Sequence, residues 1–109
     1  MSEIENSSAE AIISAAENTL TDAKNRREAE RRGAPPGEKQ RNERITRTIH
    51  KINVAMIDVR ALIGRAQWYE VMSDDAEHRL RTVSEDLQYE RRQLKKMLRH
   101  RMRPEHYST

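Results

Sequence analysis

A regular series of apolar residues between positions 45 and 66 constrains this chain more than any other feature of its sequence. Successive members are separated by steps of four and three residues in alternation, which is the spacing of one face of an α-helix. The series covers three heptads without a miss and consists of Ile45, Ile49, Ile52, Met56, Val59, Ile63 and Ala66. It predicts a long helix in the middle of the chain.

A second apolar row lies on the opposite side of the same predicted helix and contains Val54, Ile57, Ala61 and Trp68. A helix that is apolar on two faces usually lies between other elements or is shared between two subunits. We therefore place this helix at the centre of the structure and expect it to form an apolar interface. The residues predicted for that interface are Ile49, Ile52, Met56, Ile57, Val59, Ile63, Trp68 and Tyr69.

Two interpretations of Trp68 and Tyr69 stay open, because they lie at the predicted end of the central helix. Aromatic residues at an exposed corner often anchor an interface. Alternatively, Trp68 closes the end of the helical bundle. Gly64 is compatible with both, since a glycine inside a helix permits close approach of another backbone.

The strongest break in the chain is the Gly- and Pro-rich segment at 33–37, which predicts a turn. The preceding residues 8–32 read as a docking helix, with Ser7 and Glu10 as a capping box and residues 1–7 as a flexible tail. Its apolar face is a narrow row of small residues, Ile13, Ala16, Leu20 and Ala23. Such a helix is marginal alone and must pack on something else.

After Met72 the apolar series changes phase. Ser73, Asp74 and Asp75 supply the short oxygen-bearing side chains that cap a helix N-terminus. A break there makes residues 38–103 an antiparallel helical hairpin, with helices near 38–71 and 75–102. The alternative is one continuous helix of about 65 residues, close to 100 Å long, in an extended coiled-coil-like packing. The new series consists of Ala76, Leu80, Val83, Leu87, Leu94 and Met97.

We therefore predict an all-α fold of three helices in a single helical domain at 8–103, with a flexible tail at 104–109. Composition alone is ambiguous, because 36% charged residues and no Phe describe both disordered and helical chains. The periodic series favours helices. The 109 residues supply so few large apolar side chains that a solitary core barely offsets chain entropy, which favours a homo-oligomer or a standing protein partner.

Charge is strongly segregated along the chain. The net charge is −5 in residues 1–23, +5 in residues 24–47 and +7 in residues 91–103, although the whole chain carries only +3. The last block forms a basic ridge on one face of the third predicted helix, opposite its apolar face. The partner- or phosphate-binding residues predicted there are Arg91, Arg92, Lys95, Lys96, Arg99 and Arg103.

Three interpretations of this ridge remain open. It is a solvated helix face, a contact for phosphates of nucleic acid, or a contact for an acidic protein surface. The excess of Arg over Lys favours bidentate pairing but does not separate phosphate from carboxylate. No nucleic-acid reading module is recognisable, and Tyr89 is the one aromatic residue near the ridge. Charges flanking the central series, such as Arg47, Lys51, Asp58 and Glu70, are expected to be solvated and without function.

Catalytic chemistry has little support in the sequence, and we predict neither an enzyme, a cofactor nor a small-molecule substrate. The chain has no Cys, which excludes disulfides and thiolate zinc sites. His50, His78, His100 and His106 lack metal-ligand spacing, and no glycine-rich phosphate loop or nucleophile motif is present.

The chain has no apolar stretch long enough to cross a membrane and begins with an acidic segment, so a cytoplasmic protein or a component of a larger intracellular or virion assembly is expected. The predicted function is a non-catalytic helical interaction or assembly module, by class-level analogy a phage accessory protein. The alternative is a nucleic-acid-associated protein that binds the phosphate backbone through residues 91–103.

Overall fold

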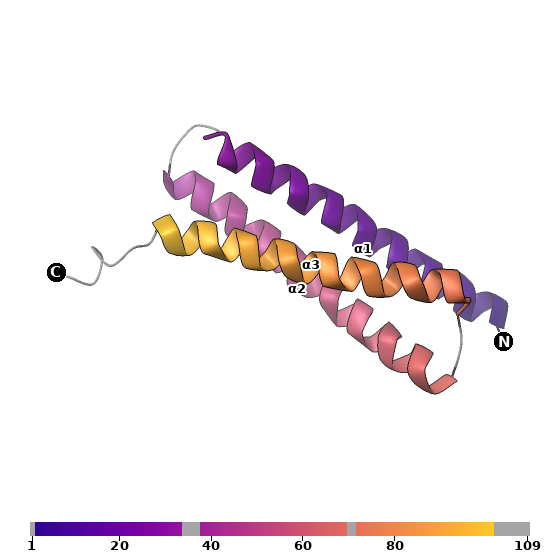
Figure 1. Ribbon diagram of the computed structural model, residues 1–109. Coiled ribbons are helices and arrows are strands. Elements are labelled where there is room, and N and C mark those ends of the chain that lie inside the picture. Colours follow the sequence, from indigo (N-terminus) through magenta and orange to yellow (C-terminus); the bar gives the residue numbers. More distant parts are fainter. Residues whose placement is uncertain (1, 34–37, 70–71, 102–109) are drawn as a thin grey trace.

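Three helices pack side by side in an elongated bundle that measures 59 × 25 × 17 Å (Figure 1). The computed structural model describes residues 2–33, 38–69 and 72–101. For residues 2–8, 38, 66–69 and 99–101 it describes only the helical backbone and not the side chains. The helices are α1 (Ser2–Arg31), α2 (Glu38–Tyr69) and α3 (Asp74–Arg101). Helices α2 and α3 form an antiparallel hairpin, and α1 packs against both. The predicted all-α fold is confirmed. Of the two arrangements considered after residue 38, the helical hairpin is observed and the single long helix is not.

Ser73 marks the start of α3 at the corner between α2 and α3. Its side-chain oxygen accepts a hydrogen bond from the backbone N–H of Ala76 at 3.1 Å, and its carbonyl oxygen accepts one from Glu77 at 2.9 Å. Ser73 is thus the N-cap of α3, as the sequence predicts, and Asp74, Asp75 and Glu77 lie in the first turn, where the helix dipole favours negative charge.

The core is the line along which the apolar faces of the three helices meet. Each of the three predicted apolar series contributes to it, and most of their members are less than 9% exposed. Two buried members lie outside the predicted series: Ala9 and Leu62 are each 2% exposed, whereas Ile63 of the predicted series only packs at the edge. The core cluster consists of Ala9, Ile13, Ala16, Leu20, Ala23, Ile45, Ile49, Ile52, Met56, Val59, Leu62, Ala76, Leu80, Val83, Leu87 and Leu94.

Helix α1 differs from the prediction at its start. It begins at Ser2, whereas the sequence was interpreted as a tail up to residue 7 with a cap at Ser7. Ser7 therefore lies inside the helix, and Glu10 contacts α3 instead of completing a capping box. The helix ends as expected: Gly33 has a φ of +78°, in the left-handed region that favours glycine. The rest of the predicted turn, the tail at 104–109 and Arg103 lie outside the described residues.

Candidate functional site

The fold brings the two basic blocks of the sequence to the same end of the bundle. Helices α1 and α3 both run toward the end at which α2 begins (Figure 1). The C-terminal part of α1 from Lys24, the start of α2 up to Arg47 and the part of α3 from Arg91 therefore lie together, and we call this region the basic end. The opposite end contains the N-termini of α1 and α3, where acidic residues are concentrated.

A buried carboxylate, that of Glu30, connects the last turns of α1 to the first turns of α2. Glu30 is 2% exposed. Arg44 donates two hydrogen bonds to it, from Nε to Oε2 at 2.6 Å and from Nη2 to Oε1 at 3.1 Å. Arg26 donates a third at 3.3 Å, and Nε of Arg41 lies 3.6 Å from Oε1. The hydrogen bonds from Arg44 are the main reason that the pKa of Glu30 is lowered, and they outweigh the opposing effect of burial.

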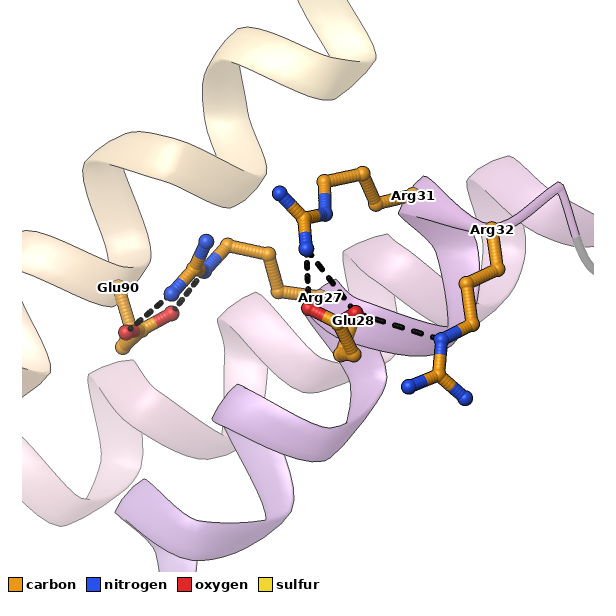
Figure 2. Close-up of polar contacts among 5 residues, drawn as sticks. All are labelled: Arg27, Glu28, Arg31, Arg32 and Glu90. Atoms are coloured by element: carbon orange, nitrogen blue, oxygen red, sulfur yellow. Dashed lines mark hydrogen bonds and ion pairs between the residues drawn. The ribbon is translucent and has the colours of Figure 1, made fainter.

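A second ion pair joins α1 to α3 at the same end (Figure 2). Arg27 binds Glu90 in a bidentate manner, with Nε–Oε1 at 2.6 Å and Nη2–Oε2 at 3.1 Å. Glu90 is 2% exposed and lies along the core line between Leu87 and Leu94. The guanidinium of Arg27 also lies 5.9 Å from the centre of the Tyr89 ring, within the range of a cation–π contact.

Glu28 pairs with two arginines at the exposed end of α1. Its carboxylate accepts hydrogen bonds from Arg31 at 2.9 and 3.0 Å and from Arg32, the residue after α1, at 3.3 Å (Figure 2). The hydrogen bonds from Arg31 are the main reason that the pKa of Glu28 is lowered. Glu28, Glu30 and Glu90 are thus all held by arginines of this chain, which leaves fewer free carboxylates at the basic end.

Toward the acidic end, Arg79 of α3 bridges two carboxylates of α1. It binds Glu17 at 2.7 and 3.1 Å and Glu10 at 2.9 Å. The hydrogen bonds from Arg79 lower the pKa of Glu17. Because this pair and the Arg27–Glu90 pair are far apart along α1, together they define how α1 aligns with α3.

The residues of the predicted basic ridge do not all behave alike. Arg91 reaches across the surface to α2 and donates a hydrogen bond to Asn53 at 2.8 Å. Arg92, Lys95 and Lys96 are exposed, and none of them forms an ion pair with another described residue. The side chain of Arg99 and all of Arg103 lie outside the described part of the chain.

The fold buries some residues of the predicted apolar interface and leaves others exposed. Ile49, Ile52, Met56 and Val59 fill the core of a single chain, so they are not free to contact a partner as the sequence analysis expected. The reason is that α1 and α3 cover this face of α2. Ile63 is half-buried, Ile57 is 68% exposed, and the side chains of Trp68 and Tyr69 lie outside the described residues.

A groove of about 460 Å³ lies between α1 and α2. Val54, which is 49% exposed, forms part of its wall. The floor and sides are otherwise made mostly by small or aliphatic residues of both helices, with His50 and Asp58 at its two ends on α2. The small and aliphatic lining residues besides Val54 are Ala11, Ile12, Ala15, Ala16 and Ala55, and the polar residues Thr19 and Lys51 also line the groove.

The ion pairs between helices were not predicted from the sequence. Glu30 and Glu90 occupy positions where the helical repeat calls for an apolar side chain, and that interruption was the available signal. Their partners, Arg44 and Arg27, could not be identified because they lie 14 and 63 residues away in sequence.

Comparison with protein-family models, curated proteins and solved structures found no match to this chain. Within the described ranges, no helix is both long and apolar enough to cross a membrane. The same residues contain no group of three or more His, Cys, Asp or Glu that could hold a metal ion.

Proposed function

We propose that this protein is a non-catalytic helical module that attaches to an acidic protein surface through its basic end. The observation that carries the proposal is the convergence of both basic blocks at one end of the bundle, while the acidic side chains Glu28, Glu30 and Glu90 are held in internal ion pairs. The exposed side chains of Arg92, Lys95 and Lys96 remain available to carboxylates of a partner.

One observation favours a protein surface over nucleic acid. Tyr89, which is 46% exposed, is the one aromatic ring exposed beside the described part of the ridge, and Arg27 already lies near it. The alternative, binding of a phosphate backbone, rests on the same free cations.

Anisotropy measurements with two labelled probes, a polyglutamate peptide and a DNA duplex, test this proposal over a salt series. We expect the peptide to bind at low salt. The double variant Arg92→Glu with Lys96→Glu should weaken peptide binding by about tenfold or more, because it places like charges opposite each other.

The matched control is Arg60→Glu with Arg81→Glu, which makes the same change in net charge at exposed positions outside the basic end. It should bind the peptide nearly as well as the natural chain does. Tighter binding to the duplex, with a steep loss of affinity as salt rises, would replace the proposal by the nucleic-acid function. Binding to neither probe would refute both.

A further inference from the structure

The outward face of α2 carries a second helical series that a single chain leaves uncovered. Its steps are four or three residues, and each member is exposed. In the described part of the chain, none of its charged members forms an ion pair or a side-chain hydrogen bond. We call this series the outer row, and it consists of Glu43, Arg47, His50, Val54, Ile57, Ala61 and Arg65.

Two pairs of residues with complementary character lie at equal distances on either side of Val54 on this face, whereas Arg47 and Lys51 lie opposite the uncharged Ala61 and Ile57. His50 lies four residues before Val54, and the exposed Asp58 lies four residues after it. Glu43 lies eleven residues before, and Arg65 eleven residues after. If two α2 helices cross antiparallel at Val54, the residues equidistant from Val54 face each other. Glu43 then meets Arg65, and Asp58 meets His50.

The groove beside the outer row provides the matching shape. It lies near the middle of both helices, between residues 11 and 19 of α1 and residues 50 and 58 of α2. Ala11, Ala15 and Ala55 keep it open, while the exposed Val54 and Ile57 of the outer row form a ridge, of which Val54 lines the groove. A ridge and a groove on one surface make it self-complementary, which is what a two-fold symmetric interface requires.

We propose that two copies of this chain pack antiparallel through the α1–α2 face, with the two-fold axis close to Val54. Ile57 of each copy enters the groove of the other, and the Glu43–Arg65 and Asp58–His50 pairs form on both sides of the axis. The basic end of one copy then lies beside the acidic end of the other. This contact uses a surface separate from Arg92, Lys95 and Lys96, so it is independent of the proposed function.

A second copy is favoured over a foreign helix because the complementary charges belong to this chain itself. Glu43 and Arg65 are 22 positions apart on one straight helix, about 33 Å at 1.5 Å per residue, so they cannot pair within one copy. A foreign helix would use the apolar groove without requiring the charges of α2 to match about Val54.

The first experiment measures the mass of the full chain by sedimentation equilibrium over a range of concentrations. The natural chain should form dimers, and Val54→Glu should be monomeric, since it buries a charge at the axis. Thr82→Glu, at an exposed position of α3, is the control and should remain dimeric. Circular dichroism of each variant shows whether the helices are retained. A natural chain that stays monomeric, or a folded Val54→Glu variant that stays dimeric, would overturn the proposal.

Charge exchange tests the antiparallel register. Glu43→Arg alone and Arg65→Glu alone should each weaken the dimer, and the variant with both changes should recover most of the lost affinity. Because the two positions are too far apart to interact in one copy, recovery requires contact between copies. If the losses in the two single variants simply add in the double variant, this pairing is wrong.

Oxidative cross-linking tests the same register by distance, helped by the absence of any natural Cys. Val54→Cys should form a disulfide-linked dimer, because its two copies lie at the axis. Arg47→Cys alone and Ala61→Cys alone should not, but a mixture of these two variants should cross-link to each other. Cross-linking of Arg47→Cys with itself at the rate of Val54→Cys would indicate a parallel dimer and refute the proposal.

Discussion

The middle of the bundle and the basic end both have a buried interior, yet the two interiors are held together differently. In the middle, side chains such as Ile13, Ile52 and Leu80 are 0% exposed and pack without polar atoms. Near the basic end the same inward positions carry Glu30, which pairs with several arginines, and Glu90, which pairs with Arg27. We call this second region the ionic layer, and it consists of Arg26, Arg27, Glu30, Arg41, Arg44 and Glu90.

The difference between the regions reflects what each contributes. Apolar contacts supply most of the favourable free energy but specify register weakly, since the small residues of α1 could slide along the hairpin. Buried ion pairs add little net stability because desolvation opposes them, but a carboxylate placed wrongly would be buried without a partner. The ionic layer therefore fixes the position of α1, and the apolar middle drives it to pack.

The largest effect is expected in the apolar middle. Ile52→Ala should lower the free energy of unfolding by about 2 to 5 kcal/mol, because it removes buried methyl and methylene groups and leaves a cavity. Urea denaturation measures this change, and it should be the same at low and high salt. Thr82→Ala, at an exposed position, is the control, with an expected change within about 0.5 kcal/mol. A strong salt dependence of the Ile52→Ala effect would contradict the view that apolar contacts alone hold the middle of the bundle together.

The next effect is expected at Glu30, and it should depend on pH. Glu30→Gln keeps the shape but removes the charge that faces the surrounding arginines, so it should lower the free energy of unfolding by about 2 kcal/mol at neutral pH. The pKa of Glu30 is lowered in the folded state from its ordinary value of 4.5. The unfolded chain therefore binds more protons in acid, and this stabilisation is lost as the pH falls through the lowered folded value.

The variant tests this sign directly. Urea denaturation at neutral pH and in acid should show a gap between the natural chain and Glu30→Gln that narrows in acid. Glu17 and Glu28, whose pKa values are also lowered, respond equally in both proteins and cancel in the comparison. A gap that stays constant through this range would mean that the charge of Glu30 does not stabilise the fold.

The smallest effect is expected from Arg27→Lys, which keeps the charge but loses the two parallel hydrogen bonds to Glu90. It should cost about 1 kcal/mol of unfolding free energy. The matched control is Arg31→Lys, because Arg31 pairs with Glu28 on the exposed surface, where no measurable change is expected. Thermal or urea denaturation of both variants side by side measures the difference. Equal effects at the two positions would mean that burial of Glu90 has no energetic consequence.

Much of the fold could be predicted from the sequence because helical periodicity is a local property. The inward series from Ile45 to Val59 and from Ala76 to Leu94 are buried as predicted, and the capping role of Ser73 could be identified from its neighbours. The choice between a hairpin and one long helix could not be made, because neither Gly nor Pro lies between residues 72 and 75. Packing of α3 back onto α2 decides it.

Less of the candidate site could be predicted from the sequence. The exposed cations Arg92, Lys95 and Lys96 could be identified from a run of like charges, but the hydrogen bond of Arg91 could not, since its partner Asn53 is 38 residues away. The sequence also marked both apolar faces of α2 without distinguishing them. The structure covers the face of Ile52 and leaves that of Ile57 exposed.

By itself, then, the sequence determined the three helices, their apolar faces and the blocks of charge, because these depend on residues within a few turns of one another. Only the tertiary structure decided which face of α2 became the core, which carboxylates were buried with arginines, and that both basic blocks lie at one end. The physical reason is that these outcomes depend on the antiparallel alignment of helices, which brings together residues such as Arg27 and Glu90 that are 63 positions apart.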